Sequence, residues 1–336
     1  MTAFETGTTH ITDAARRALQ GAGLEPAALL ARHRSCDWGQ VSDAQRIRNA
    51  WALEQGDLIR SIYPLPDGTR ILVSTADTRD ATWVMLRTEF GPREVDLLPG
   101  YACWARTYEK GMNPLIELEE PHVAPILEAL QPSLVLDVGT GTGRYARRLA
   151  QRGTQVLATD LCPEMLAVAQ RHAIEDRLDL GLHLCALDAL PIRSDSIPLV
   201  VCALVLCHVA DLRRAFAELA RPTAPGGHVL ITDFHPEAVA SGMRSGVAQA
   251  DGWCALPNPH RTRDGYLTAL QASGLVPVQI IDLRVGDIPE EKKRFFGTWV
   301  QEDADRLFCL IVLARKPDAA PPPAAVSRAK QLAELP

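Results

Sequence analysis

The stretch Val135-Leu136-Asp137-Val138-Gly139-Thr140-Gly141-Thr142-Gly143-Arg144 decides the fold, because an apolar strand runs directly into a tight glycine-rich turn. A second acid, Asp160, closes the next apolar run twenty-one residues after the first glycine. This order of strand, glycine turn and strand-end acid is typical of an open α/β sheet whose first loop holds a nucleoside-containing ligand.

The residue types of this turn favour a particular kind of ligand. A side chain at any of the three glycines would obstruct a ligand lying against the turn. The Asp160 carboxylate only accepts hydrogen bonds, which suits two sugar hydroxyl donors. The usual dinucleotide pattern, G-x-G-x-x-G, would require glycine where this chain has Arg144, so a pyrophosphate site is the second alternative.

Apolar runs alternate with helical patterns on both sides of this turn. Strands are predicted at 133–138, 155–160, 182–187, 199–204, 228–233, 277–283 and 307–314. Helices are predicted between the first five strands, which favours a mostly parallel sheet covered on both faces. The last two runs frame a longer connection and predict an antiparallel edge hairpin.

The first part of the chain has a different pattern. Helical periodicity covers 11–30, and three β-like runs follow at 58–63, 70–75 and 81–86. The turn Pro66-Asp67-Gly68 joins the first two runs and favours a hairpin, because glycine supplies a positive φ. We therefore expect a small α+β accessory module with a three-stranded meander.

Composition shifts divide the chain into three parts. Residues 1–98 are expected to form the accessory module, and residues 99–316 the α/β domain. A lid insertion is expected within that domain, around 236–265, since long connections in compact domains are often functional. The Pro- and Ala-rich segment 317–336 is predicted to be a disordered tail.

Bulk properties exclude several classes of protein. The chain has 336 residues and a net charge of −6, which favours neither nucleic acid nor an anionic membrane as a partner. Its eight cysteines include no C-x-x-C pair, so we expect buried thiols and no zinc site or other metal site. No apolar run is long enough to span a membrane, and a cytoplasmic location is expected.

Residues 101–316 resemble the class I S-adenosylmethionine-dependent methyltransferases, in the branch of ubiquinone/menaquinone C-methyltransferases and small-molecule O-methyltransferases. The resemblance implies a Rossmann-like, mostly parallel seven-stranded sheet. It also implies S-adenosyl-L-methionine as cofactor and S-adenosyl-L-homocysteine as product. The cofactor-binding residues that it implies are Tyr108, Asp137, Gly139, Thr140, Gly141, Gly143, Asp160, Leu161, Met165, Leu187, Asp188, Ala189 and Ala203.

The expected cofactor contacts rest mainly on three acids. Asp137 matches the acid near the amino-acid part of the cofactor, Asp160 the ribose acceptor, and Asp188 the acid that binds the adenine amino group. Each also has a structural alternative: Asp137 as a capping or loop-bracing carboxylate, and the other two as turn residues. Upstream of the fourth strand the family's Phe-Asp pair is replaced by Ile197-Pro198, so no role is assigned there.

Three histidines follow strand ends or lie in the insertion, and they are the candidate bases. His208 follows the fourth strand, where the ligand crevice of an open α/β sheet lies. His235 follows the fifth strand in Asp233-Phe234-His235-Pro236, and His260 precedes the run Tyr266-Leu267-Thr268-Ala269-Leu270. The alternative for each is a packed or surface histidine with no chemical role.

Aromatic residues precede the first strand of the α/β domain. Tyr101, Trp104 and Tyr108 recur at a spacing of three to four residues, so they are expected to share one helical face. They are interpreted either as an aromatic lid over the cofactor or as core packing.

Residues 33–90 resemble short uncharacterised proteins often associated with plasmids. The resemblance rests on His33, Cys36-Asp37-Trp38-Gly39, Arg60-Ser61-x-Tyr63 and Thr75-Ala76-Asp77-x-Arg79. It implies no chemistry. The module is interpreted as a structural addition, with substrate capture, a homodimer surface and a partner-docking platform as alternatives.

The expected function is methyl transfer to a small, biosynthetic acceptor by in-line displacement. Alternatives are a domain that binds the cofactor without turnover, and a methyltransferase for a peptide or protein recruited by the accessory module. The histidines do not identify the acceptor atom, because a carboxylate or thiolate acceptor needs no general base.

Overall fold

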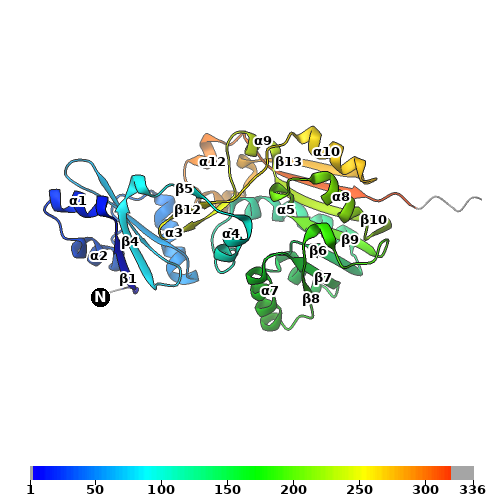
Figure 1. Cartoon of the computed structure of the whole chain (residues 1–336), viewed down its shortest axis with the longest axis horizontal. Coiled ribbons are helices and arrows are strands. Elements are labelled where there is room, and N and C mark those ends of the chain that lie inside the picture. Colours follow the sequence, from blue (N-terminus) through cyan, green and yellow to red (C-terminus); the bar gives the residue numbers. More distant parts are fainter. Residues whose placement is uncertain (1–2, 319–336) are drawn as a thin grey trace, which may run out of the picture.

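The computed structural model describes residues 3–318. A smaller N-terminal body and a larger α/β body lie side by side, and a small sheet lies between them (Figure 1). The predicted tail falls almost entirely outside the described residues.

The N-terminal body contains a four-stranded sheet in the order β1-β4-β3-β2. Its strands are β1 (Thr8–Ile11), β2 (Ile59–Pro64), β3 (Arg70–Thr75) and β4 (Ala81–Leu86). The last three form the expected antiparallel meander. The sequence reasoning missed β1, which pairs in parallel with β4 at the edge.

Three helices accompany this sheet: α1 (Asp13–Gly21), α2 (Pro26–Arg34) and α3 (Asp43–Gln55). The single helical stretch expected over 11–30 is two helices, because Pro26 starts a new one at its first turn. Helix α3 was not predicted. Its Ser42 N-cap accepts a hydrogen bond from the Gln45 amide.

A buried histidine connects the helices of this body to its sheet. His33 on α2 is fully buried, and its ring nitrogens lie 2.5 Å from the Ser61 hydroxyl and 2.9 Å from the Thr75 hydroxyl. Burial lowers the pKa of His33 to about 3, so the ring is neutral at physiological pH. His33 therefore bridges two strands as an internal hydrogen-bonding group.

The α/β body is built on a seven-stranded sheet in the order β13-β14-β10-β9-β6-β7-β8. The strands are β6 (Leu134–Val138), β7 (Gln155–Asp160), β8 (Gly181–Leu184), β9 (Ile197–Ala203), β10 (Thr223–Phe234), β13 (Val276–Arg284) and β14 (Leu307–Arg315). The expected fold class is confirmed. The antiparallel part is one strand, β14, which inserts between β10 and β13 and runs opposite to both.

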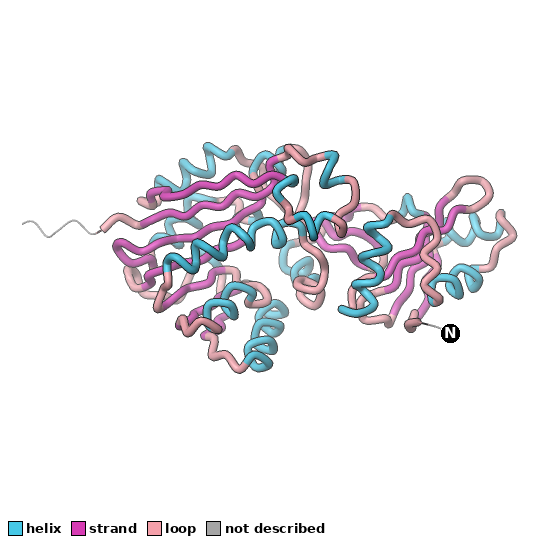
Figure 2. Tube along the Cα trace, turned by 180° about the vertical axis from the view of Figure 1, so that it is seen from behind, coloured by secondary structure: helices cyan, strands magenta, loops and turns pink. Residues whose placement is uncertain are grey.

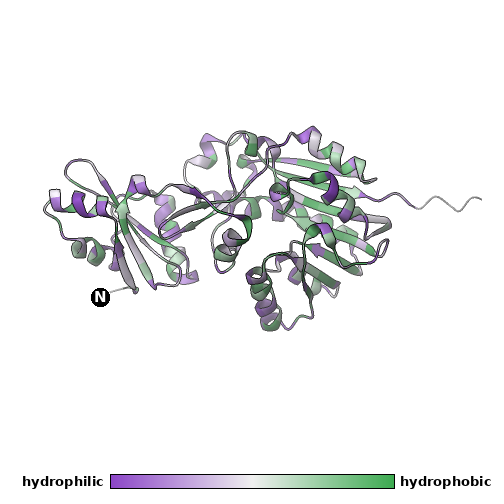
Figure 3. Ribbon diagram, viewed as in Figure 1, coloured by the Kyte–Doolittle hydropathy of each residue, from purple (hydrophilic) through white to green (hydrophobic). Residues whose placement is uncertain are grey.

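Helices cover both faces of this sheet (Figure 2). The helices of this body are α4 (Leu97–Trp104), α5 (Pro114–Leu130), α6 (Arg144–Ala150), α7 (Pro163–Asp176), α8 (Leu212–Ala220), α9 (Pro236–Ala240), α10 (Arg263–Ala272), α11 (Glu290–Lys293) and α12 (Trp299–Glu302). One face packs on α5 and α6, and the other on α8 and α10. Hydrophobic residues dominate the strands between these layers, as expected for a doubly covered sheet (Figure 3).

The expected lid insertion connects the two bodies. It contains α9, β11 (Gly246–Gln249) and β12 (Gly252–Ala255). Strand β12 pairs in parallel with β5 (Pro92–Glu94), which leaves the N-terminal body, and Arg93 forms an ion pair with Asp251 at 2.8 Å. The insertion is thus part of the junction between the bodies.

No helix within residues 3–318 combines the length and apolar character that crossing a membrane requires.

Candidate cofactor and active site

The glycine turn joins β6 to α6, and its three glycines have different reasons to lack a side chain. All have positive φ, at +68° for Gly139, +58° for Gly141 and +85° for Gly143. A Cβ on Gly139 would lie 2.3 Å from a Val205 methyl carbon, and one on Gly143 would lie 3.2 Å from the Ala169 Cβ. Only at Gly141 would a Cβ meet open space. Of the three glycines, Gly141 is therefore the one that leaves open space at the turn, whereas Gly139 and Gly143 pack closely against other segments of the chain.

Asp160 lies at the end of β7, beside this open space. Its carboxylate accepts hydrogen bonds from the backbone amides of Gly141 and Cys162, each at 2.8 Å. Burial raises the pKa of Asp160, and these amide donors act against that rise. Asp160 thus fixes the glycine turn to the neighbouring strand.

Asp137 lies beneath the turn and braces it. It is 2% exposed and accepts a hydrogen bond from the Thr140 hydroxyl at 2.7 Å. Burial raises its pKa to about 6. This contact matches the loop-bracing alternative for Asp137.

A cavity opens above the turn, at the carboxyl ends of β6, β7 and β9. Predicted cofactor residues that line it are Tyr108, Gly139, Gly141, Asp160, Leu161, Met165, Leu187 and Ala203. The others (Asp137, Thr140, Gly143, Asp188 and Ala189) are not among its lining residues. Sequence reasoning missed Leu97 and Leu98 at the start of α4, because nothing local indicates that this helix folds back over the turn.

Asp188 has another partner in the structure. It lies in a short helical turn, Leu187–Ala189, and forms an ion pair with Arg214 at 2.9 Å. Its side chain is 44% exposed. Asp188 thus stands outside the cavity, while its neighbour Leu187 lines it.

His208 is the one candidate base that lines this cavity. Its Nδ1 lies 2.7 Å from the Pro257 carbonyl oxygen, which can only accept, so Nδ1 carries the proton. Nε2 then accepts a hydrogen bond from the Tyr101 hydroxyl at 2.9 Å. Burial lowers the pKa of His208 to about 4, so the ring stays neutral and orients Tyr101.

The two other candidate bases lie elsewhere. His235 caps α9 from a fully buried position, with Nε2 3.1 Å from an Asp282 carboxylate oxygen. Arg263 binds the same carboxylate at 2.7 Å. His260 is exposed. Neither histidine lines the cavity, because the insertion turns toward the N-terminal body after β10.

The three aromatic residues form a row at one wall of the cavity, with Tyr101 stacked on Trp104 and Tyr108 packed edge-on against Trp104. Their ring centroids are 5.8 Å apart for Tyr101 and Trp104, and 5.0 Å apart for Trp104 and Tyr108. The expected single helical face is interrupted, because α4 ends at Trp104 and a turn carries Tyr108. Tyr101 and Tyr108 line the cavity, and Trp104 faces away from it.

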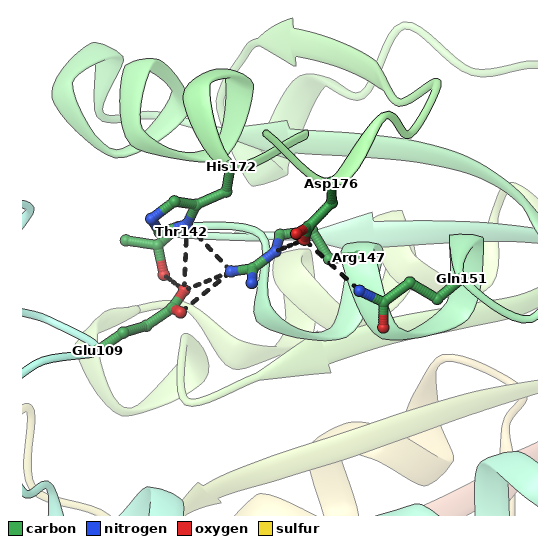
Figure 4. Close-up of polar contacts among 6 residues, drawn as sticks. All are labelled: Glu109, Thr142, Arg147, Gln151, His172 and Asp176. Carbon is green, nitrogen blue, oxygen red and sulfur yellow. Dashed lines mark hydrogen bonds and ion pairs between the residues drawn. The ribbon is translucent and has the colours of Figure 1, made fainter. Parts of the chain in front are cut away.

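A polar cluster holds the turn that carries Tyr108 (Figure 4). Glu109 accepts hydrogen bonds from the Thr142 hydroxyl and from the Arg147 guanidinium, the latter at 3.0 Å. Arg147 also pairs with Asp176 on α7 at 2.9 Å. The cluster thus connects the aromatic wall, the glycine turn and two helices.

These residues fit a nucleoside cofactor. Open space at Gly141 admits a ligand close to the backbone, and Asp160 supplies an acceptor for hydroxyl groups. Within residues 3–318, no cluster of three or more histidine, cysteine or acidic side chains is arranged to hold a metal ion.

Comparisons with known proteins identify this part of the chain. Residues 136–231 match the family described as "Methyltransferase domain". A demethylmenaquinone methyltransferase of Thermus thermophilus is 36% identical over 107 residues, which cover 31% of this chain and 49% of the relative. A ubiquinone biosynthesis O-methyltransferase of Alkalilimnicola ehrlichii is 32% identical over 124 residues, covering 37% and 50%. The chain spans about half the length of these curated relatives.

One solved structure, an S-adenosylmethionine-dependent methyltransferase from Mesorhizobium loti, superposes with a TM-score of 0.48 at 25% identity. The superposition covers 59% of this chain and 97% of that one. The family match extends from the glycine turn into β10. Residues 136–231 of the chain therefore match a methyltransferase domain, and both curated relatives are methyltransferases.

Proposed function

We propose that this chain transfers the methyl group of S-adenosylmethionine to a small-molecule acceptor by in-line displacement. The observation that carries the proposal is the cavity at the strand ends, where Gly141 leaves open space directly beside the Asp160 carboxylate. The names of the two curated relatives favour a small biosynthetic acceptor.

In this proposal, Asp160 accepts hydrogen bonds from the ribose hydroxyls, and the backbone at Gly141 lies against the cofactor. Leu161, Met165 and Leu187 supply apolar surface around the nucleoside. Asp137 acts indirectly, by bracing the glycine turn through Thr140.

Bound S-adenosylmethionine supplies a methyl group that its sulfonium already activates. The chain's own task is then to orient the reactants and to exclude water. Tyr101 and Tyr108 close one wall of the cavity, and His208 holds Tyr101 in place. With its pKa lowered to about 4, His208 is a weak proton acceptor, so we assign it a positioning role.

A matched pair of glycine variants tests cofactor binding. Gly141 and Gly153 both have positive φ, and a Cβ on either would meet open space, but only Gly141 lines the cavity. We expect Gly141→Leu to weaken S-adenosylhomocysteine binding at least about a hundredfold, since the new side chain would fill the site. Gly153→Leu should carry the same backbone strain and bind normally.

Isothermal titration calorimetry of both variants and of the unmodified chain provides the measurement. Equal loss of affinity in the two variants would remove the glycine turn from the binding site. Transfer of a radiolabelled methyl group to members of a small-molecule panel would then separate turnover from binding without turnover.

A further inference from the structure

A second cavity lies between the two bodies. One wall comes from α3 and β2 of the N-terminal body. The other comes from the turn after α4, the insertion that contains β11 and β12, and the segment around α12. Figure 1 shows α3, α4 and β12 meeting in this middle region. The N-terminal body therefore supplies part of the wall.

The second cavity is strongly aromatic. It is lined by Trp51, Trp104, Trp253 and Trp299, which are four of the six tryptophans of the chain. Aromatic walls favour a planar, apolar ligand, because offset stacking adds to the burial of apolar surface.

The second cavity also has an excess of positive charge. Arg48, Arg60 and Arg244 line it, against a single carboxylate, Asp57. Burial raises the pKa of Asp57, which weakens its negative charge. The Arg48 Nε already donates to the Phe295 carbonyl oxygen at 2.5 Å.

Arg60 is the arginine that points most clearly to a ligand. Its Nε is buried and has no hydrogen-bond partner among the residues that the structure describes. Its guanidinium lies 4.7 Å from the centre of the Phe90 ring, and it retains its charge at neutral pH, since its pKa is about 10. A buried guanidinium nitrogen without a hydrogen-bond partner is unfavourable, and an anionic ligand would satisfy it.

The two cavities share the aromatic row as a common border. Trp104 lines the second cavity, and its ring packs against Tyr101 and Tyr108, which line the cofactor cavity. The second cavity therefore lies next to the cofactor cavity, where an acceptor has to bind.

We infer that the second cavity binds the methyl acceptor, and that this acceptor is an aromatic molecule bearing an anionic group. The inference rests on the proposed methyl transfer and extends it to a substrate class. The N-terminal body then contributes to substrate binding through Arg48 and Arg60, and Arg60 is the main partner of the anion.

Quenching of tryptophan fluorescence measures the binding directly. The probes are 1-naphthoate and 1-naphthyl phosphate, which carry two kinds of anion, and 1-naphthamide, which is neutral. For Arg60→Gln we expect both anions to bind at least about tenfold more weakly and the amide to bind within twofold of its original affinity, since charge-assisted hydrogen bonds are lost. The anion that binds more tightly indicates whether the natural acceptor carries a carboxylate or a phosphate.

Two further variants keep the test decisive. Arg70→Gln is the control, because Arg70 is an exposed arginine on the neighbouring strand β3, and it should change no affinity. Arg244→Gln changes an exposed residue of the other body, and so keeps the N-terminal body intact. We expect this variant to bind the two anions about threefold more weakly, since a partly exposed charge contributes less.

Binding of S-adenosylhomocysteine separates the two proposals. If the cofactor binds equally well to all variants while Arg60→Gln and Arg70→Gln bind 1-naphthoate alike, the acceptor site is refuted and methyl transfer stands. Equal affinity of the unmodified chain for 1-naphthoate and 1-naphthamide would also refute it. If no cofactor binds to the unmodified chain, the proposed function fails instead.

Discussion

The cofactor cavity and the cavity between the bodies differ in how the chain builds them. Most of the first comes from one stretch, residues 138–209, where successive strand ends meet at one edge of a parallel sheet. The second draws on residues 45–60, 104–115, 234–253 and 296–308. A local, ordered set of strand ends can be recognised in a sequence, whereas a wall assembled from four distant segments cannot.

The two cavities also differ in chemistry. The cofactor cavity is largely apolar, with Asp160 as the acid that lines it. The second cavity has three arginines and four tryptophans. This difference suggests separate sites for a nucleoside and for an anionic aromatic acceptor, and it can be tested one cavity at a time.

The largest expected effect concerns Asp160. Its replacement by alanine removes the proposed acceptor of the ribose hydroxyls and two bonds that fix the glycine turn. We expect S-adenosylhomocysteine binding to weaken by about 2–4 kcal/mol. The affinity for 1-naphthoate should change less than twofold. Calorimetry and fluorescence quenching measure the two, and a parallel loss of both affinities would show that the cavities are not separate sites.

Acidification should affect the N-terminal body through His33. The pKa of His33 is about 3 in the folded state and about 6.5 when unfolded, so the unfolded state binds the proton first. The stability that the neutral ring provides is complete above pH 6.5 and is lost as the pH falls toward 3. Between pH 8 and pH 5 the expected loss is about 2 kcal/mol.

Urea denaturation at both pH values measures this effect, and His33→Gln, which does not titrate, is the comparison. Asp137 works in the opposite direction: its pKa, raised to about 6, makes the folded state bind a proton first between pH 6 and pH 4. The difference in pH dependence between the unmodified chain and His33→Gln isolates the contribution of His33 to stability. An identical pH dependence would contradict the assignment.

Trp104 is the residue whose change should affect both cavities. Trp104→Ala removes an aromatic layer that packs on Tyr101 and Tyr108. We expect both S-adenosylhomocysteine and 1-naphthoate to bind about 1 kcal/mol more weakly, since each aromatic pair contributes about 0.5–1.5 kcal/mol. If only one affinity changes in these titrations, Trp104 does not form a shared wall.

The smallest expected effect concerns the polar cluster of Figure 4. Glu109→Gln weakens the ion pair with Arg147, which is partly exposed and therefore worth less than about 1 kcal/mol. Cofactor affinity should fall about two- to threefold and 1-naphthoate affinity should stay the same. Repeating both titrations at high salt provides the control, because screening should reduce the difference between the two chains.

Sequence reasoning reached the sheet, its cofactor class and most of the strand-end residues. It placed eight of thirteen predicted cofactor residues on the cavity, because period-2 and glycine patterns act over short distances. It did not predict that a side chain at position 139 would collide with Val205, or that Asp188 forms an ion pair with Arg214. Both facts depend on segments that are distant or exposed, and no local pattern encodes them.

The sequence by itself determined that an apolar strand, a positive-φ glycine turn and a strand-end acid would create a nucleoside site, because neighbouring parallel strands bring those residues together wherever the sheet forms. The tertiary structure alone decided which histidine faces that site and that the N-terminal body closes a second cavity. Those outcomes follow from the path of the insertion, which pairs β12 with β5. His235 and His260 therefore lie away from the cofactor cavity, and Arg60 and Trp253 line the same second cavity.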